Sequence, residues 1–220
     1  MISHKHKCIF VHIPKTAGTS IESALRQSNA EFEPLQLGDF DPATIPPHAN
    51  GYRGLNRWDI KHYPAQFLRQ DYNEYLKFCF VRNPWDLMVS CYFWWLQRPQ
   101  LEIRKIQGRI LKQMGFANFV FSFYTDYINE IFHQGLGQSY WLLDELGSPV
   151  VNFVGRFETL QHDFEIVCDQ IGIAKIQLPS TNRSIRSRYF EYYNEDTQKL
   201  IGLKFSSDID RFNYSFHDKS

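Results

Sequence analysis

Near its N-terminus the chain reads Cys8-Ile-Phe-Val-His-Ile-Pro-Lys-Thr-Ala-Gly-Thr-Ser-Ile-Glu-Ser-Ala-Leu25. The segment from Cys8 to Ile13 is mostly apolar or β-branched and predicts a short strand. Pro14 ends that strand because proline has no amide hydrogen for the ladder. Apolar residues return at helical spacing at Ile21, Ala24 and Leu25. The order strand, tight loop, helix is typical of a phosphate-binding unit.

The loop itself is rich in small, hydroxyl and cationic residues, each suited to an anion. Gly18 lets the backbone approach a ligand, and the first amides of a helix that begins near Thr19 have no partner inside the helix. Lys15 adds a positive charge, and the hydroxyls of Thr16, Thr19 and Ser20 add donors for phosphate or sulfate oxygens. The alternative is an ordinary turn with Thr19 or Ser20 as the N-cap. The density of these residues favours the anion site.

This loop differs from the common nucleotide-triphosphatase loop, in which a lysine and a magnesium-binding hydroxyl follow the last glycine. Here Lys15 precedes Gly18. The next strand that the sequence predicts clearly, Leu76–Val81, is followed by Arg82 and not by the aspartate that would complete a magnesium site. We therefore expect an anion site without a metal.

Length and composition point to one globular core. With 220 residues, of which 43% are hydrophobic and 16% aromatic, a single domain is the natural expectation. The formal net charge is zero, which argues against nucleic-acid or anionic-membrane binding driven by overall charge.

The cysteines and the N-terminus carry the expectation about location. Cys8, Cys79, Cys91 and Cys168 lie in apolar contexts without metal-type or disulfide-framework spacing, so we expect reduced, buried thiols. The first residues do not resemble a signal peptide, and no window approaches a membrane span. The expectation is a soluble, cytoplasmic protein.

A second unit of strand followed by helix begins at Leu76–Val81 and continues as Arg82-Asn-Pro-Trp-Asp-Leu-Met-Val-Ser-Cys-Tyr92, where Pro84 is placed at a helix start. If the two strands are parallel neighbours, Arg82 leaves the sheet at the edge where ligands gather in α/β folds. Ser90, further along the helix, adds a hydroxyl. The alternative pairs Arg82 with Asp86 in a salt bridge and makes Ser90 a packing residue. The two interpretations are equally plausible from these residues alone.

Several further elements are predicted with less chemistry attached. The segment Ala30–Tyr63 is rich in proline and glycine and reads as an irregular loop with a short strand near Pro34–Leu37. Pro64 opens a helix that runs toward Arg69, which places His62 just before a helix start. An isolated histidine is more often a packed or surface residue than a catalyst.

The C-terminal half predicts a strand over Val150–Glu158, an amphipathic helix over Thr159–Ile171 closed by Gly172, and a helix from Glu195. Buried helical segments are also expected over Phe93–Lys112, broken near Pro99, and over Ala117–Phe132. The tail residues Asp208, Asp210, Phe212, Tyr214 and Phe216 should pack back on the body.

The segment Asn182-Arg-Ser-Ile-Arg-Ser-Arg188 combines three arginines with two serines. It is suited to clamp the far end of a polyanionic ligand. The alternative is a solvated basic turn, which is the more natural reading for Arg186 and Arg188.

Two of these motifs resemble those of sulfotransferases that use 3′-phosphoadenosine 5′-phosphosulfate (PAPS). The stretch His12-Ile-Pro-Lys-Thr-Ala-Gly-Thr-Ser20 resembles their 5′-phosphosulfate loop, and Phe80-Val-Arg-Asn-Pro-Trp-Asp86 through Ser90 and Tyr92 resembles their 3′-phosphate motif. The group most similar in pattern is the Golgi-type carbohydrate sulfotransferases with their bacterial relatives. Similarity extends to Lys61, His62, Ala65, Val154–Glu158, Leu160, Phe164, Asn182, Ser184, Asp210, Phe212, Tyr214 and Phe216.

The resemblance implies a role for each matching position. His62 aligns with the general base of many relatives, and Lys15 would neutralise charge on the bridging oxygen as the sulfuryl group departs. Leu87 departs from the pattern, because many relatives carry arginine there, and Ala17 stands where many carry glycine. The implied donor-binding residues are Lys15, Thr16, Ala17, Gly18, Thr19, Ser20, Arg82, Ser90, Asn182, Arg183 and Ser184.

We therefore expect an α/β chain with a P-loop-like three-layer fold, in which helices flank a central, mostly parallel sheet, and a single sulfotransferase domain over residues 1–220. The expected reaction is metal-free transfer of a sulfuryl group from PAPS to an acceptor hydroxyl on a small molecule or glycan. The alternatives are a P-loop small-molecule kinase and a non-catalytic nucleotide-binding protein. No segment specifies the acceptor or the oligomeric state.

Overall fold

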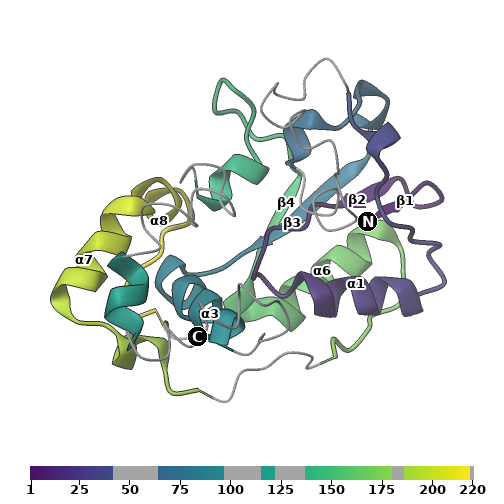
Figure 1. Cartoon of the computed structure of the whole chain (residues 1–220). Coiled ribbons are helices and arrows are strands. Elements are labelled where there is room, and N and C mark those ends of the chain that lie inside the picture. Colours follow the sequence, from purple (N-terminus) through teal and green to yellow (C-terminus); the bar gives the residue numbers. More distant parts are fainter. Residues whose placement is uncertain (42–63, 97–114, 122–136, 180–185, 219–220) are drawn as a thin grey trace, which may run out of the picture. The chain divides into compact units, whose positions relative to one another are not determined.

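The computed structural model describes residues 1–41, 64–96, 115–121, 137–179 and 186–218 (Figure 1). The chain divides into two compact units. The first, here the sheet unit, is Met1–Val81 with Tyr140–Thr181, and the second, the helical unit, is Arg82–Ser139 with Asn182–Ser220. A single domain over residues 1–220 stays a prediction.

The sheet unit is built on four strands in the order β1-β2-β3-β4. The short β1 (Ile2–Ser3) pairs antiparallel with β2 (Cys8–Phe10), whereas β2 with β3 (Leu76–Val81) and β3 with β4 (Phe153–Arg156) are parallel pairs. Parallel neighbours need a crossover connection, and a helix at Gly18–Gln27 lies in the chain between β2 and β3, with another at Pro84–Leu96 between β3 and β4. The predicted α/β fold with a central, mostly parallel sheet flanked by helices is confirmed.

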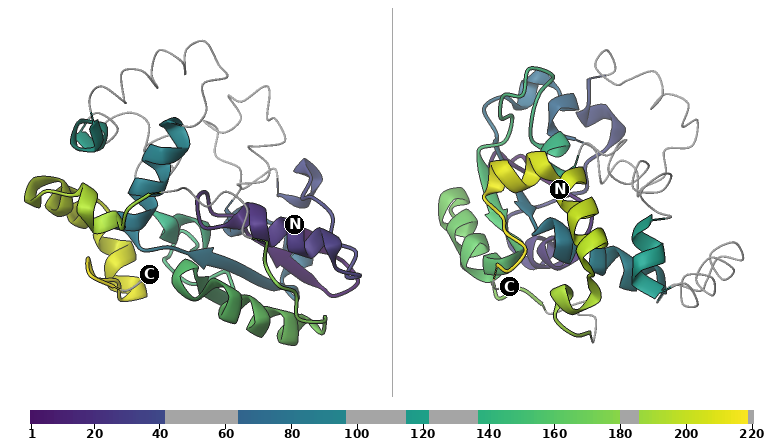
Figure 2. Two further views of the ribbon diagram at one scale, coloured as in Figure 1. Left: turned by 90° about the horizontal axis from the view of Figure 1, so that it is seen from below. Right: turned by 90° about the vertical axis from the view of Figure 1, so that its left-hand side faces the viewer.

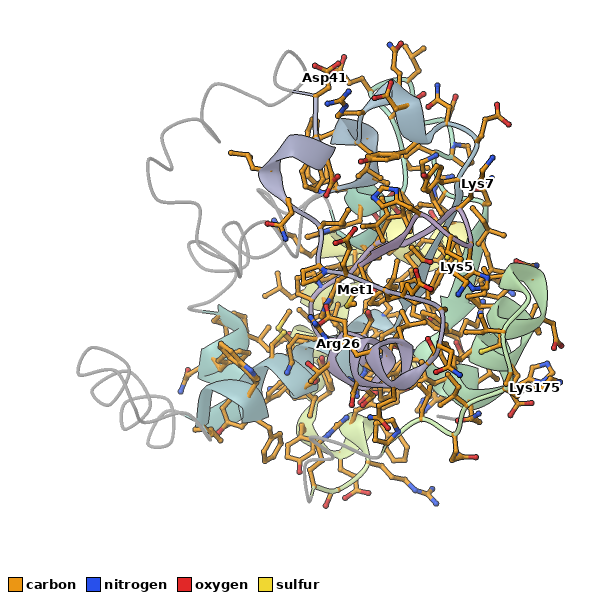
Figure 3. All side chains as sticks on the ribbon, turned by 90° about the vertical axis from the view of Figure 1, so that its right-hand side faces the viewer. Met1, Lys5, Lys7, Arg26, Asp41 and Lys175 are labelled. Atoms are coloured by element: carbon orange, nitrogen blue, oxygen red, sulfur yellow. The ribbon has the colours of Figure 1, made fainter. Side chains whose placement is uncertain are left out.

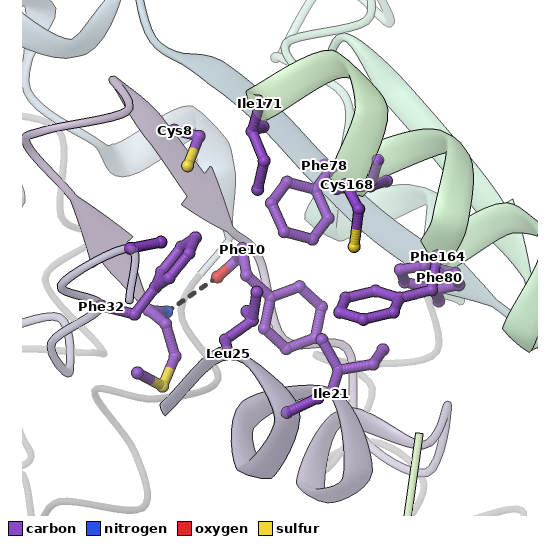
Figure 4. Packing of buried hydrophobic residues seen from close by; sticks show 14 residues of the cluster. Cys8, Phe10, Ile21, Leu25, Phe32, Phe78, Phe80, Phe164, Cys168 and Ile171 are labelled. Carbon is purple, nitrogen blue, oxygen red and sulfur yellow. Dashed lines mark hydrogen bonds between the residues drawn. The ribbon is translucent and has the colours of Figure 1, made fainter. Parts of the chain in front are cut away.

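One face of this sheet packs against two helices, α1 (Gly18–Gln27) and α6 (Leu160–Ile171). Side chains alternate across a strand, so Cys8, Phe10, Phe78 and Phe80 point to the same face. Figure 4 shows them packed with residues of both helices, and the left view of Figure 2 shows β3 between α1 and α6. The helix residues of this core are Ile21, Ala24, Leu25, Phe164, Val167, Cys168 and Ile171.

The opposite face of the sheet is also buried, as Ile9, Cys79 and Val81 show. Burial on both faces is what near-continuous apolar strands predict in parallel sheets. It is also what the central layer of a three-layer fold requires.

Two local predictions in the sheet unit are wrong. No strand covers Pro34–Leu37, and a single 3-10 turn lies at Leu37–Asp39 instead. The segment after Pro64 is not an α-helix but two 3-10 turns, Ala65–Phe67 and Gln70–Tyr72. The reason is tertiary, because the two segments bond to each other: Asp41 N donates to Phe67 O and Arg69 N donates to Asp39 O.

The helical unit contains α3 (Pro84–Leu96), α7 (Glu195–Lys204) and α8 (Ser206–Phe212), with a further helical stretch at 115–121. Pro84 begins α3, as predicted. The parts of the predicted helices that fall in 97–114 and 122–136 lie outside the described residues.

Most of the tail packs inside the helical unit, as expected, whereas Asp210 is exposed. The ring of Phe216 lies 5.6 Å from that of Trp85 and 5.4 Å from that of Tyr193. Tyr214 and Asp208 are buried as well. These contacts hold the start of α3 against the last residues of the chain.

All four cysteines are buried and free, as predicted.

Lys5 and Lys7, in the turn between β1 and β2, are exposed at the surface of the sheet unit (Figure 3). Lys5 Nζ lies 2.6 Å from Glu31 Oε1, an exposed pair of the kind that adds little stability. Among the described residues, no helix combines the length and apolarity needed to cross a membrane.

Candidate functional site

The loop between β2 and α1 has an unusual backbone. Lys15 and Ala17 both have φ of 68°, in the left-handed region that non-glycine residues rarely adopt. Thr16 between them is not in that region. Alternation of the sign of φ along consecutive residues turns successive N–H groups toward one side and creates a concave anion site. Such strain is typical of functional loops.

The helix that follows this loop begins without a capping side chain. Its N-cap is Ala17, and neither a side-chain cap nor an acidic residue is present in its first turn. Thr19 and Ser20 lie inside the first turn, so the alternative in which one of them is the N-cap is wrong. Neither the N-cap side chain nor an acidic residue of the first turn offsets the partial positive charge at this helix start, which favours an anion there.

The hydroxyl of Thr16 has a different use from the one expected. Thr16 is fully buried, and its Oγ1 donates to Ile13 O at 2.9 Å. That bond holds the loop's own turn together. Lys15 is half-buried, Thr19 is exposed and Ser20 is buried. The residue that carries positive charge in this loop is Lys15.

Gly18 is required for a steric reason that the sequence did not reveal. Its φ is not in the left-handed region. A Cβ added at Gly18 would lie 2.1 Å from Nε2 of His12 and 2.4 Å from its Cε1. The imidazole ring occupies the place where a side chain would stand, so the glycine accommodates the histidine whether or not a ligand approaches.

His12 in turn is held by Glu22, which lies on α1. Its Nδ1 is 2.7 Å from Glu22 Oε1, and the two side chains are only 5% and 12% exposed. The ring of Phe10 lies 5.6 Å from the imidazole, centroid to centroid. The pair is therefore enclosed within the sheet unit, with the imidazole against Gly18 of the loop.

In the helical unit, Arg82 forms the salt bridge to Asp86 that the alternative interpretation anticipated. Arg82 Nη2 and Nε lie 2.7 and 2.8 Å from Asp86 Oδ2. The other carboxylate oxygen of Asp86 accepts from Nη2 of Arg186. One buried carboxylate thus orients two guanidinium groups.

Burial and these two arginines act in opposite directions on Asp86. Burial raises the pKa of its carboxyl, but Arg82 and Arg186 lower it by more, so the pKa lies below its ordinary value. Asp86 is therefore ionised across the neutral range. A phosphate at this cluster would meet two fixed guanidinium groups in place of flexible ones.

The backbone of Arg82 is fixed by a side chain. Arg82 N donates to Gln138 Oε1 and Gln138 Nε2 donates to Arg82 O, both at 2.8 Å, so the amide of Gln138 imitates a neighbouring strand. Gln138 N and Ser139 N donate to the buried carboxylate of Asp208. Burial raises the pKa of Asp208, which these donors offset only in part.

The start of α3 differs from the start of α1. Trp85 N donates to Asn83 Oδ1, so Asn83 caps this helix. The amide of Trp85 is therefore already bonded, and the positive charge at this place comes from the guanidinium groups. Ser90 is half-buried on α3, and Leu87, where the resemblance calls for arginine, is fully buried.

Four predicted site residues, His62, Asn182, Arg183 and Ser184, lie outside the described residues. Within the described ranges, no group of three or more histidine, cysteine, aspartate or glutamate side chains is placed to hold a metal ion.

Sequence reasoning assigned no role to His12, Glu22 or Gln138, and it favoured a solvated position for Arg186. The sequence does contain a local indication of the contact between His12 and Glu22. Glu22 follows Gly18 by four positions and therefore lies on the same face of the helix. The contacts of Gln138 and Arg186 join positions far apart in the chain, which no local pattern encodes.

The fold and the loop first define a class: an α/β protein in which a left-handed turn suited to an anion follows an inner strand of the sheet. A family model then assigns the chain more specifically, because the model described as "Sulfotransferase family" matches residues 1–215. The chain belongs to the sulfotransferase family.

Curated relatives agree with this assignment. The chain is 23% identical to carbohydrate sulfotransferase 10 of Xenopus laevis, 22% to that of Gallus gallus and 24% to that of Danio rerio. The alignments cover 97%, 99% and 97% of this chain but 66%, 66% and 65% of the relatives. The chain thus spans about two thirds of their length.

Among solved structures, the chain is similar to a sulfotransferase from Alicyclobacillus acidocaldarius, with a TM-score of 0.46 and 18% sequence identity. The superposition covers 93% of each chain.

Proposed function

We propose that the chain transfers a sulfuryl group from PAPS to an acceptor hydroxyl on a carbohydrate. The observation that carries this proposal is the loop after β2, where Lys15 stands beside left-handed backbone and an uncapped helix start. Membership of the sulfotransferase family supplies the chemistry for which this anion site would be used.

In the proposed complex, the amides at the start of α1 and the ammonium of Lys15 hold the 5′-phosphosulfate. Fixed donors are most effective where charge builds during the reaction. Here the bond between sulfur and the bridging oxygen breaks while the acceptor oxygen bonds to sulfur, so charge accumulates on the bridging oxygen. We assign to Lys15 the neutralisation of this charge, in the manner of in-line phosphoryl transfer.

The 3′-phosphate is assigned to Arg82, with Ser90 as an additional donor. Two features support this. Strands β2 and β3 are parallel neighbours, and in the chain the loop follows β2 while Arg82 follows β3, the positions after parallel strands where α/β proteins bind ligands. The guanidinium of Arg82 is also oriented in advance by Asp86. In the same proposal, Asn182, Arg183 and Ser184 complete the donor site.

His62 is proposed as the general base that takes the proton of the acceptor hydroxyl. Its unperturbed pKa of about 6.5 suits this task near neutral pH. General-base catalysis of this kind contributes ~10²–10⁴-fold. The proposal rests on the family resemblance.

A carbohydrate acceptor is proposed because the relatives are named carbohydrate sulfotransferase 10. The relatives are longer than this chain, so their acceptors are a starting set for screening. Labelled PAPS incubated with a panel of glycans tests the acceptor class directly.

Three variants test the assignment of roles. Lys15→Ala and Arg82→Ala should each reduce donor binding or turnover by at least about 100-fold, because each removes a charged contact to the donor. His62→Ala should bind the product nucleotide normally and lose transfer. Near-normal turnover by His62→Ala would exclude it as the base, and ATP turnover that depends on magnesium would favour the kinase alternative.

A further inference from the structure

We propose that His12 and Glu22 are a positioning pair for the anion-binding loop. The imidazole, held by the carboxylate, packs against Gly18 and thereby fixes the start of α1. This inference rests on the proposed function, since it assigns the pair a role in donor binding. It concerns residues that would not touch the donor themselves.

The first argument is steric. The ring of His12 lies so close to Gly18 that a Cβ there would be 2.1 to 2.4 Å from three ring atoms, distances that real contacts do not reach. The ring is itself enclosed, with only 5% of the side chain exposed. Protein interiors are close-packed, so a filled space of this kind fixes the backbone on both sides of it.

The second argument is electrostatic. Glu22 is nearly buried and lies one turn after Gly18, within the helix whose start we assign to an anion. A buried carboxylate without a partner is costly and would repel that anion. The contact of 2.7 Å between Glu22 Oε1 and His12 Nδ1 gives the carboxylate a partner. The pair therefore both fixes the loop and gives the enclosed carboxylate a hydrogen-bond partner.

The third argument concerns strain. Lys15 and Ala17 are held in left-handed backbone, which persists only where the surroundings enforce it. Ala17 immediately precedes Gly18, so an immobile Gly18 is a direct means of holding Ala17. Loss of the ring should let the loop relax toward ordinary backbone and separate the convergent amides.

The binding test compares His12→Ala and Glu22→Gln with wild type by calorimetric titration of 3′-phosphoadenosine 5′-phosphate (PAP), and by donor kinetics if the acceptor is known. We expect PAP affinity to fall about tenfold in His12→Ala and less in Glu22→Gln, the range of coupling between contacting residues. Donor KM should rise while kcat at saturating donor changes little, because uniform binding is lost.

Glu165→Gln is the matched control. Glu165 is a carboxylate of α6 in the same unit, paired with Lys175 at 3.8 Å, and it has no place in the site. It should bind PAP as wild type does. Equal losses in Glu165→Gln and Glu22→Gln would indicate general destabilisation and overturn the proposal.

A double-mutant cycle tests the steric argument by itself. Gly18→Ala should abolish PAP binding in the wild-type background, but a detectable part of that binding should return in the Gly18→Ala, His12→Ala double variant because the ring is gone. No rescue would show that Gly18 serves the ligand alone. The proposal also fails if His12→Ala binds PAP like wild type. A wild-type protein that does not bind PAP overturns the proposed donor, and with it the role of the pair.

Discussion

At the scale of single residues, the site depends on backbone that its own side chains do not favour. Ala17 occupies a left-handed position that glycine would adopt without strain, and the same holds for Lys15. Lys15 carries the positive charge that the proposed chemistry needs, so its strained backbone positions a functional side chain. Ala17 contributes only its backbone to the loop, and its methyl group destabilises the left-handed conformation.

Ala17→Gly should therefore stabilise the protein. Left-handed backbone costs a non-glycine residue roughly 1–2 kcal/mol, and the extra freedom of glycine in the unfolded chain offsets part of the gain. The expected net gain is about 0.5–1 kcal/mol, measured by thermal or urea unfolding. Ala24→Gly, in the interior of α1, is the control and should destabilise. A loss of stability in Ala17→Gly would contradict the strain assigned to this loop.

At the scale of secondary-structure elements, β4 pairs closely with β3 in the sheet. Gly155 of β4 pairs with Phe80 of β3. A Cβ added at Gly155 would lie 2.4 Å from Cε1 of Phe80. The glycine makes room for an aromatic side chain of the core beside α6. Its φ is not in the left-handed region, so the requirement is steric.

Gly155→Ala should destabilise the sheet unit by about 1–3 kcal/mol, the usual cost of overpacking a core. Gly38 is a suitable control, since a Cβ there would meet nothing within 4 Å. Gly38→Ala should leave the midpoint of urea unfolding nearly unchanged. If both variants behave alike, the close packing between β3 and β4 is not as described.

The start of α3 gives a prediction that depends on pH. The pKa of Asp86 is lower in the fold than its usual value, so its pairing with Arg82 and Arg186 stabilises above the unfolded pKa of about 3.9. That stabilisation is lost as pH falls through the lower folded pKa. Asp86→Asn should cost about 3–5 kcal/mol at neutral pH, because two guanidinium groups lose their buried partner.

The difference in unfolding free energy between wild type and Asp86→Asn should shrink below pH of about 4, since the carboxyl of the unfolded wild type then binds a proton that the folded protein binds only at lower pH. Urea unfolding at several pH values measures it. Asp169, an exposed residue 3.4 Å from Lys175, provides the control, and Asp169→Asn should change stability by less than about 1 kcal/mol. A pH-independent cost of Asp86→Asn would contradict the role of the ion cluster.

Elements whose signal is local could be predicted from the sequence. The strand Leu76–Val81 was recognised from its apolar run, and α6 was recognised from an amphipathic pattern that ends at Gly172, which has φ of 70°. The turns around Asp39 and Phe67 could not be predicted, because their backbone groups bond to each other across the fold and not within a helix.

The same distinction applies to the site. The tight loop from Lys15 and the helix after it could be predicted because their signal is contained in one short segment, while the donor-binding role of Lys15 through Ser20 stays a prediction. Asp86 was foreseen as a partner of Arg82, one helical turn away. Arg186 was read as a solvated residue, since its contact with Asp86 joins residues a hundred positions apart.

At the scale of the whole molecule, the account assigns the two ends of one donor to two segments. The loop after β2 is assigned the 5′-phosphosulfate, and Arg82 after β3 is assigned the 3′-phosphate. A ligand with only one of these groups should lose the contribution of the other segment. This is the claim on which the proposed reaction depends.

Calorimetric titration of the purified chain with PAP and, in parallel, with adenosine 5′-monophosphate tests this claim most directly. The account predicts that PAP binds and that the monophosphate, which lacks the 3′-phosphate, binds at least about tenfold more weakly, with the difference removed in Arg82→Ala. No affinity for PAP, or equal affinity for both nucleotides in the wild-type protein, would contradict it.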